Sequence, residues 1–357
     1  MKIWGASKRN RRRTLLFAAF GLLTILTVMG AAIFSWLGGV LLSQQAAARF
    51  AGGSGERFSQ VSVFFPASQS IAEDDVFSFR FELDKKLVAA SLEATEEGSL
   101  YTDAYSAEGT MTVTGPRGNA TAPVLGVGGD YFVFHPLELI SGTYISGDDL
   151  MHDRVVLDEA LAWKLFGGTD VAGLEVLIGG EPWPVAGVVR REEDFATQKA
   201  YSGDGALYMA FDRLSAEQKV QTYEIVCVDP ISGFISGIVE ERFKDCAVVE
   251  STGRYGVESI FGVIKDFGTR SMNTVGVIYP YWENAARFVE DYAALTLLLT
   301  LLCALFPAVL TLVFIVICIR HGWRRLRTGL PALHDRHQTR RYERRLLKRA
   351  KEGDGEA

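Results

Sequence analysis

A few histidine and aspartate side chains are the candidates for metal binding considered first. A zinc site needs three or four ligands at suitable spacing, and Met151-His152-Asp153 supplies two with no third nearby in the sequence. His135 stands alone between Phe134 and Pro136. A carboxylate cluster could bind calcium, but it lacks the alternating spacing of a calcium loop; its members are Asp148, Asp149, Asp153 and Asp158. We interpret it as a solvated acidic loop and predict no metal site.

Catalytic and nucleotide-binding motifs are also missing from the sequence. It contains neither the Gly-x-Ser-x-Gly motif of hydrolases nor the GxxxxGK[ST] phosphate loop. The glycines of residues 126–129 do not have phosphate-loop spacing, and we interpret them as a strand end that needs unusual backbone angles. We therefore predict that the chain is not an enzyme and has no catalytic residue and no cofactor.

Four cysteines could add redox chemistry. Cys303 and Cys318 lie in an apolar stretch and are most simply packing residues. Cys227 falls late in one expected strand and Cys246 begins the next, so a parallel pair of these strands would hold them at opposite ends. A disulfide needs Cα atoms within about 7 Å. We predict no bridge, and the sequence leaves the redox state of these two thiols open.

Two long apolar stretches frame the chain, and the charge changes sign at both. Residues 14–42 and 293–319 contain no charged side chain, and a helix needs about 20 apolar residues to cross a bilayer. Residues 1–13 carry six basic residues and no acid, residues 320–357 carry 12 basic and 5 acidic residues, and residues 43–292 carry 19 basic and 38 acidic residues. Because basic flanks stay cytoplasmic, the pattern predicts two transmembrane helices in the plasma or inner membrane, both termini in the cytoplasm, and an extracytoplasmic domain between the helices.

Each end of the chain has an alternative interpretation. The first apolar stretch could be a cleaved signal peptide, since basic residues precede it and small residues follow at 46–48. A signal core is typically about 7–15 residues long, so the length favours a retained anchor. The basic tail begins directly after a span, which favours contact with anionic lipid at the cytoplasmic face over a partner protein's acidic surface. We predict no nucleic-acid binding.

Hydrophobic periodicity predicts a mixed α+β fold for residues 43–292. A helix over 73–91 opens with three acids and would bury an apolar face; this face consists of Val76, Phe79, Leu83, Leu87 and Ala90. The other expected elements are strands at 60–65, 111–114, 122–127, 154–157, 174–178, 183–189, 222–228 and 246–249, and helices at 159–166 and 232–243. Gly179-Gly180 predicts a tight hairpin turn.

These elements suggest two lobes, a β-α-β layer near the membrane and an inserted strand-rich lobe. Residues 43–57, rich in Ala, Gly and Gln, would form a flexible link or an irregular helix end.

Aromatic residues lead into the second apolar stretch. Tyr279-Pro280-Tyr281-Trp282-Glu283-Asn284 is followed by Phe288 and Tyr292. One interpretation is an interfacial anchor, and the other is a rigid elbow that transmits force between the domain and the span. Pro307 removes a backbone hydrogen bond inside the second stretch, which predicts a kink.

Five segments of residues 137–191 follow one another in a family-specific order. They are Leu139-Ile140-Ser141-Gly142-Thr143-Tyr144, Arg154-Val155-Val156-Leu157-Asp158-Glu159, Leu165-Phe166-Gly167, Gly173-Leu174-Glu175-Val176-Leu177-Ile178 and Trp183-Pro184-Val185-Ala186-Gly187-Val188-Val189. In this order and spacing the chain resembles the extracytoplasmic core domain of MacB-type ABC transporter permeases. That domain lies between the first and second spans of its family and folds as two subdomains.

The resemblance implies a permease-like subunit of a bacterial ABC transporter system. Such a subunit would couple ATPase-driven motion of membrane helices to the extracytoplasmic domain. Its implied partners are an ABC ATPase subunit, a fuller permease subunit, and an envelope protein or exported substrate. Family permeases have two further spans after the second, so this chain has the short two-span form. Small residues of the first span would let partner helices approach; they are Ala18, Gly21, Ala31, Ala32, Gly38 and Gly39. The alternative is a membrane-anchored binding or scaffold module of the cell envelope without transport activity.

Overall fold

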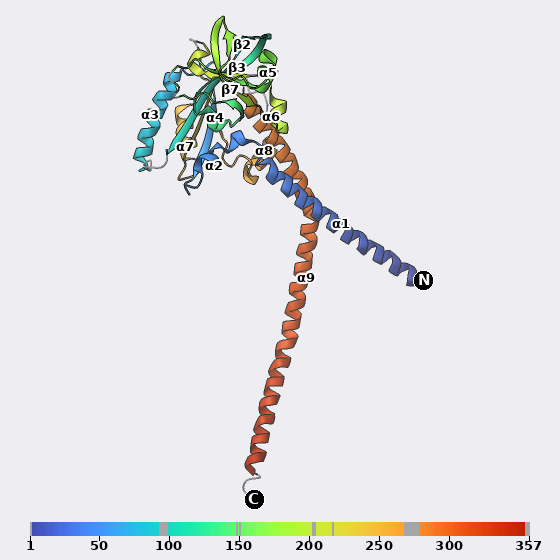
Figure 1. Ribbon diagram of the computed structural model, residues 1–357. Helices are drawn as coiled ribbons and strands as arrows, with labels where there is room; N and C mark the ends of the chain where they lie inside the picture. The colour runs from blue at the N-terminus through green and yellow to red at the C-terminus, as the bar shows by residue number, and fades with distance from the viewer. Residues whose placement is uncertain are drawn as a thin grey trace. The chain divides into compact units, whose positions relative to one another are not determined.

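The computed structural model describes residues 2–92, 99–147, 149, 151–201, 205–215, 218–267 and 279–353 (Figure 1). The chain divides into two compact units. Residues 1–32 and 298–357 make up the first unit, which is helical throughout its described part. Residues 33–297 make up the second unit, which we call the sheet domain because it holds every strand of the described chain.

Parts of two long helices make up the first unit. Helix α1 (Lys2–Leu37) and helix α9 (Tyr281–Gly353) are each long and apolar enough to cross a membrane, over Arg13–Leu37 and Tyr281–Arg324. Helix α9 continues through Pro307 without interruption, so the expected kink does not break the helix.

The two helices approach each other closely within this unit. A Cβ atom added at Gly30 would lie 2.1 Å from Thr300 Oγ1, so a larger residue at this position would have to displace the Thr300 side chain. Gly21 is different, because a Cβ atom there would have nothing within 4 Å. Helix α1 stops at Leu37, before the end of the expected first span at residue 42, and a turn at Gly38 and Gly39 follows.

One mixed sheet organises the sheet domain. Its strands are β1 (Phe58–Phe64), β2 (Tyr101–Gly115), β3 (Gly118–Gly129), β4 (Glu138–Gly142), β5 (Val155–Asp158), β6 (Glu175–Ile178), β7 (Glu181–Arg190), β8 (Leu207–Ala210), β9 (Thr222–Val228) and β10 (Ala247–Glu250). They run in the order β10-β1-β9-β2-β3-β8-β5-β7-β4, and β6 pairs with β2 and β7. The β2–β3 hairpin, closed by Pro116 and Arg117, is the link between the two ends of the sheet.

Helices connect the strands and cover the sheet. They are η1 (Leu42–Gln45), α2 (Ala46–Ala51), α3 (Glu73–Ala89), α4 (Tyr131–Phe134), α5 (Glu159–Phe166), α6 (Phe195–Ala200), η2 (Phe211–Arg213), α7 (Phe234–Arg242) and α8 (Val257–Asp266). Side chains of a strand alternate between the two faces, so each strand supplies both cores. On β9, Tyr223 and Ile225 pack with α3 and α7, while Val226 packs with α2 and the start of α9.

Several local predictions are confirmed. Val76, Phe79, Leu83 and Leu87 of α3 are buried, although Ala90 is exposed. Asp158 Oδ1 accepts a hydrogen bond from the Leu161 amide over 2.8 Å and caps α5. Gly129 ends β3 with a φ of +64°, as expected for the glycines of 126–129.

Two predictions about the architecture are wrong. The β-α-β layer and the strand-rich region are two ends of one sheet in one compact unit, because the long β2–β3 hairpin pairs with both. Of the two alternatives for residues 43–57, the flexible link is wrong and irregular helical structure agrees with η1 and α2. Gln60 binds this backbone: its Nε2 donates to Ser43 O over 2.7 Å and its Oε1 accepts from Ala46 N over 3.0 Å. Small buried side chains at 46 and 47 let this segment pack on the sheet.

Strands β9 and β10 are not neighbours either. Both pair with β1, which lies between them and runs antiparallel to each. Cys227 is opposite Ser59 at one end of β1, and Cys246 precedes the residue opposite Phe64 at the other end. Both thiols are free.

We expect Val at both Gly179 and Gly180 to destabilise the protein. The two glycines join β6 to β7 with φ angles of +62° and +88°, and a Cβ atom at either would meet nothing within 4 Å. The cost is therefore conformational, roughly 1–2 kcal/mol per residue, and lowers the free energy of unfolding of the full chain in detergent. Gly168→Val is the matched control, because Gly168 has open space and no positive φ. Equal stability of the double variant and the control would contradict the turn geometry.

Candidate functional site

Helix α9 begins inside the sheet domain, and its first three turns carry a buried ionic cluster. We call this cluster the joint; it consists of Gln44, Arg254, Glu283, Arg287 and Glu290. Gln44 lies in η1, Arg254 lies in the loop between β10 and α8, and the other three lie on α9. The joint thus ties together three segments that are far apart in the sequence.

Arg254 is the centre of the joint. Its Nη1 and Nη2 donate to Glu283 Oε2 and Oε1 over 2.7 and 2.9 Å, and its Nε donates to Glu290 Oε1 over 2.6 Å. Nη1 also donates to Gln44 Oε1 over 3.1 Å, and Arg287 Nε donates to Glu283 Oε1 over 2.8 Å. Charge-assisted, bidentate bonds of this kind are strong and directional.

The joint balances its own charge, with two guanidinium groups against two carboxylates. Arg254 is 6% exposed and Glu283 1% exposed. Burial by itself lowers the pKa of Arg254. The attraction and hydrogen bonds of Glu283 raise it by more than burial lowers it, so the pKa lies above its ordinary value. A buried charge is tolerated when it is paired in this way, and removal of one partner typically costs about 3–5 kcal/mol.

The spacing of the α9 residues fixes how this helix is oriented. Glu283, Arg287 and Glu290 recur at i, i+4 and i+7, so they share one face of the helix. A rotation of α9 about its axis would move Glu283 and Glu290 away from Arg254. The joint therefore sets both the depth and the rotation of α9 in the sheet domain.

Aromatic rings form a second contact at the same helix start. The Trp282 ring centre lies 4.4 Å from that of His135 and 5.0 Å from that of Tyr281. His135 Nε2 forms a hydrogen bond with Glu224 Oε2 over 2.5 Å, which anchors this ring to β9. Tyr281 stacks on Tyr201 with ring centres 4.4 Å apart.

The end of α1 packs against the same part of α9. Leu37 and Leu41 share an apolar cluster with Ala285, Ala286 and Val289. The two alanines are fully buried, and their small size lets the backbones approach. The end of α1 and the start of α9 therefore pack in the same apolar cluster of the sheet domain.

The interfacial-anchor interpretation of 279–292 is wrong for its central residues. Trp282 is 2% exposed and Tyr281 is 9% exposed, both inside the sheet domain. Charges interleaved with these aromatics are visible in the sequence, but the contribution of Arg254 and Gln44 was missed. The carboxylates at 283 and 290 were a usable signal, because acids on the apolar face of a helix need a buried cation. The position of that cation in the sequence was not predictable.

Most of the residues first considered for metal binding form hydrogen bonds or ion pairs with other side chains in the structure. His135 binds Glu224, and His152 Nδ1 lies 3.1 Å from Asp212 Oδ1. Asp149 pairs with Arg154, and Asp158 pairs with Arg191. Asp148 lies outside the described residues. Within the described ranges, no group of three or more His, Cys, Asp or Glu side chains could hold a metal ion.

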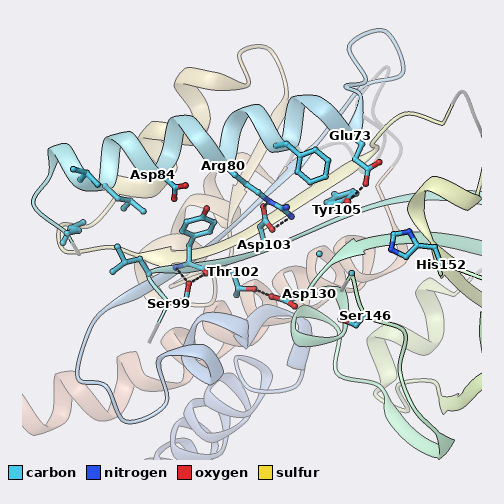
Figure 2. A pocket seen from close by; sticks show the side chains of 18 residues that line it. Glu73, Arg80, Asp84, Ser99, Thr102, Asp103, Tyr105, Asp130, Ser146 and His152 are labelled. Atoms are coloured by element: carbon cyan, nitrogen blue, oxygen red, sulfur yellow. Dashed lines mark hydrogen bonds and ion pairs between the residues drawn. The ribbon is translucent and has the colours of Figure 1, made fainter. Parts of the chain in front are cut away.

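A groove of about 830 Å³ lies between α3 and β2, away from the joint. Figure 2 shows Arg80 of α3 pointing at Asp103 of β2, and these two side chains form a bidentate pair of 2.7 and 2.8 Å. Tyr105 donates to Glu73 at one end of the groove. The polar side chains of Arg80, Asp103, Tyr105 and Glu73 are thus hydrogen-bonded in pairs along this groove.

Comparisons with known proteins come from three directions. The family model described as the MacB-like periplasmic core domain matches residues 22–233. The Macrolide export ATP-binding/permease protein MacB of Chromobacterium violaceum is 34% identical over 104 residues, which are 28% of this chain and 16% of that protein. The chain thus matches a small part of this curated relative's length.

Two solved structures are also similar. The periplasmic region of MacB from Actinobacillus actinomycetemcomitans is 15% identical with a TM-score of 0.38, covering 60% of this chain and 94% of that one. The extracellular domain of the noncanonic ABC-type transporter YknZ from Gram-positive bacteria is 16% identical with a TM-score of 0.35, covering 62% of this chain and all of that one.

We expect Arg254→Met to lower the free energy of unfolding of the full chain in detergent by about 3–5 kcal/mol, because it removes the charged hydrogen bonds of Arg254 to the buried carboxylates of Glu283 and Glu290. Arg242→Met is the matched control. Arg242 pairs with Glu82 over 3.7 Å at a half-exposed position, and such surface pairs contribute about 0–1 kcal/mol. Near-ultraviolet circular dichroism during unfolding measures both. Equal losses in the two variants would show that the joint is not a stabilising contact.

Proposed function

Because the chain belongs to the family of the MacB-like periplasmic core domain, we propose that it is a permease-type subunit of a bacterial ABC transporter system that couples ATPase-driven helix motion to its sheet domain. The family resemblance drawn from residues 137–191 is confirmed, and the match extends to residues 22–233. The sheet domain would be the part that changes posture outside the membrane.

The observation that carries this proposal is the continuity of α9. A single helix holds the buried joint in its first three turns and runs on into a segment apolar enough to cross a membrane. A helix is stiff along its axis, since every backbone group in its interior is hydrogen-bonded. Tilt or rotation of the segment would therefore reach the sheet domain through Arg254 and Trp282 rather than being lost in a flexible link.

The end of α1 supports the same proposal. Helix α1 stops at Leu37, and its end packs on Ala285 and Ala286 of α9. Gln60 of β1 holds the backbone that follows. Because the end of α1 and the start of α9 pack in the same cluster, relative motion of these two helices would change the position of the sheet domain.

The proposed location is the plasma or inner membrane, with the sheet domain outside and both termini in the cytoplasm. The charge pattern favours this orientation, because 1–13 and 320–357 are basic and 43–292 is acidic. The basic tail would contact anionic lipid at the cytoplasmic face. The structure does not describe the side chains of most tail residues, among them Arg340, Arg341 and Arg345. The proposed lipid contact is therefore argued from the charge of the tail in the sequence.

The proposed partners are an ABC ATPase subunit and a fuller permease subunit. The relative from Chromobacterium violaceum is named as an ATP-binding/permease protein, and the match covers 16% of it. The 357 residues of this chain contain no phosphate-loop motif. We propose that an ABC ATPase subunit supplies the nucleotide energy and that this chain is not itself an enzyme.

We expect a thiol introduced at Asn119 to react with a membrane-impermeant maleimide in intact cells. A thiol introduced at Glu352 should react after the cells are opened. Asn119 lies at the exposed start of β3, and Glu352 lies in the basic tail. The labelling patterns are compared in a background without the native cysteines. Labelling of position 352 in intact cells would contradict the orientation.

We expect Gly21→Leu to reduce the ATPase and permease recovered with the tagged chain by several-fold after crosslinking in whole cells. Gly21 presents open space where a partner helix could approach. Gly38 is also among the small residues expected to meet a partner helix. It is left unchanged, because a Cβ atom added there would already lie 3.4 Å from Tyr255 Cβ of this chain. Ala18→Leu is a second variant of the first span, and Leu22→Ile serves as the conservative control.

Recovery of no ATPase or permease with the unmodified chain would reject the transporter proposal. The scaffold alternative would then be favoured, with an envelope protein as the recovered partner. Equal recovery for Gly21→Leu and the control would instead show that this face of α1 does not bind the partner.

A further inference from the structure

Helix α8 has an apolar face that is wider than the surface that covers it. Val257, Ile260, Phe261 and Ile264 recur at i, i+3, i+4 and i+7, which places them on one side of the helix. Ile260 is fully buried and Ile264 partly buried in the cluster formed with α9 and the end of α1. Val257 and Phe261 are 52% and 41% exposed. Half of the apolar stripe is therefore uncovered.

Contacts within the sheet domain fix where this uncovered face lies. Tyr255, just before α8, donates through its hydroxyl to Ala286 O of α9 over 3.3 Å. A Cβ atom added at Gly38 would lie 3.4 Å from the Tyr255 Cβ, so the residue that follows α1 lies close to the segment that leads into α8. Leu37, one residue before that contact, is the last residue of the first candidate span. Helix α8 thus lies beside the place where an apolar span ends (Figure 1).

A neighbouring aromatic residue has the same character. Trp36, in the last turn of α1, is 59% exposed and stacks on Phe195 with ring centres 6.0 Å apart. Tryptophan at the end of a span is typical of the membrane–water interface. Glu258 and Lys265 are both exposed, and at about 3.6 residues per turn they lie next to Phe261 around the helix. An apolar edge that is bordered by charged side chains and lies beside the end of a span is a feature of an interfacial helix.

We propose that α8 is an interfacial helix that places Val257 and Phe261 among the lipids of the outer leaflet. The proposal rests on the proposed membrane placement of α1 and α9. Lipid is the occupant that the position favours, because the exposed edge continues from the end of an apolar span. The helix would hold the sheet domain at a fixed height at the bilayer surface, next to the joint.

Site-directed spin labelling of the full chain tests this. The chain, with its native cysteines replaced, is reconstituted in vesicles of phosphatidylcholine and phosphatidylglycerol. Nitroxides are placed one at a time at Val257 and Phe261, and their collisions with oxygen and with the water-soluble reagent Ni(II)-EDDA are measured. We expect oxygen accessibility to exceed Ni(II)-EDDA accessibility several-fold at both positions.

Helix α3 supplies matched controls. Phe81 and Val88 are 62% and 68% exposed on a helix of the same domain that lies away from α8 (Figure 1). Labels there should favour Ni(II)-EDDA. A label at Leu305 of α9, 63% exposed in the second candidate span, reports on insertion itself.

The outcomes separate the two proposals. Lipid-type accessibility at Leu305 together with water-type accessibility at Val257 and Phe261 would overturn the interfacial role of α8 and leave the membrane placement intact. Water-type accessibility at Leu305 would overturn the membrane placement. Low accessibility to both reagents at Val257 and Phe261 would also overturn the proposal, because it would show that a protein surface covers them.

Discussion

A buried guanidinium imposes the constraint on which the arrangement of the sheet domain depends. Arg254 cannot lose its proton, and every segment that approaches it must bring an acceptor. Gln44 brings one from η1, and Glu283 and Glu290 bring the others from α9. The polar atoms of three segments therefore have one low-energy arrangement, whereas apolar packing alone would tolerate several.

The sheet explains why this constraint can act on the whole domain. The loop of Arg254 follows β10, and β10 pairs with β1, which pairs with β9. On β9, Glu224 binds His135 beneath Trp282. Polar and aromatic contacts thus connect α9 to the sheet at two separate points. Two points of attachment resist rotation as well as translation, which a single contact would not.

Local structure was largely predictable, and tertiary neighbours were not. The strand at 222–228, the helix at 159–166 and the Gly179-Gly180 hairpin follow from period, capping and turn chemistry, all of which act over a few residues. The insertion of β1 between β9 and β10 was missed, because it depends on pairing across more than 150 residues.

The joint also shows that the sequence reveals local features but not their tertiary partners. Its acids at 283 and 290 were visible in the sequence beside an aromatic run, and the elbow interpretation of that run agrees with their burial. Their cation was not visible, because Arg254 lies in an unremarkable loop between β10 and α8. Similarly, Ala-rich residues after the first span suggested a flexible link, since nothing near them indicates that the Gln60 side chain binds their backbone.

The most direct test of rigid attachment is the width of a distance distribution between α9 and the sheet domain. Nitroxide labels at Tyr292 of α9 and at Ile231, both exposed, are measured by double electron–electron resonance in the full chain in lipid. Rigid attachment predicts one narrow distribution, as narrow as that between labels at Lys164 and Ile231 inside the domain, and a broader one when Arg254→Met is added. A broad or multiple distribution for Tyr292 and Ile231 in the otherwise unchanged protein would contradict it.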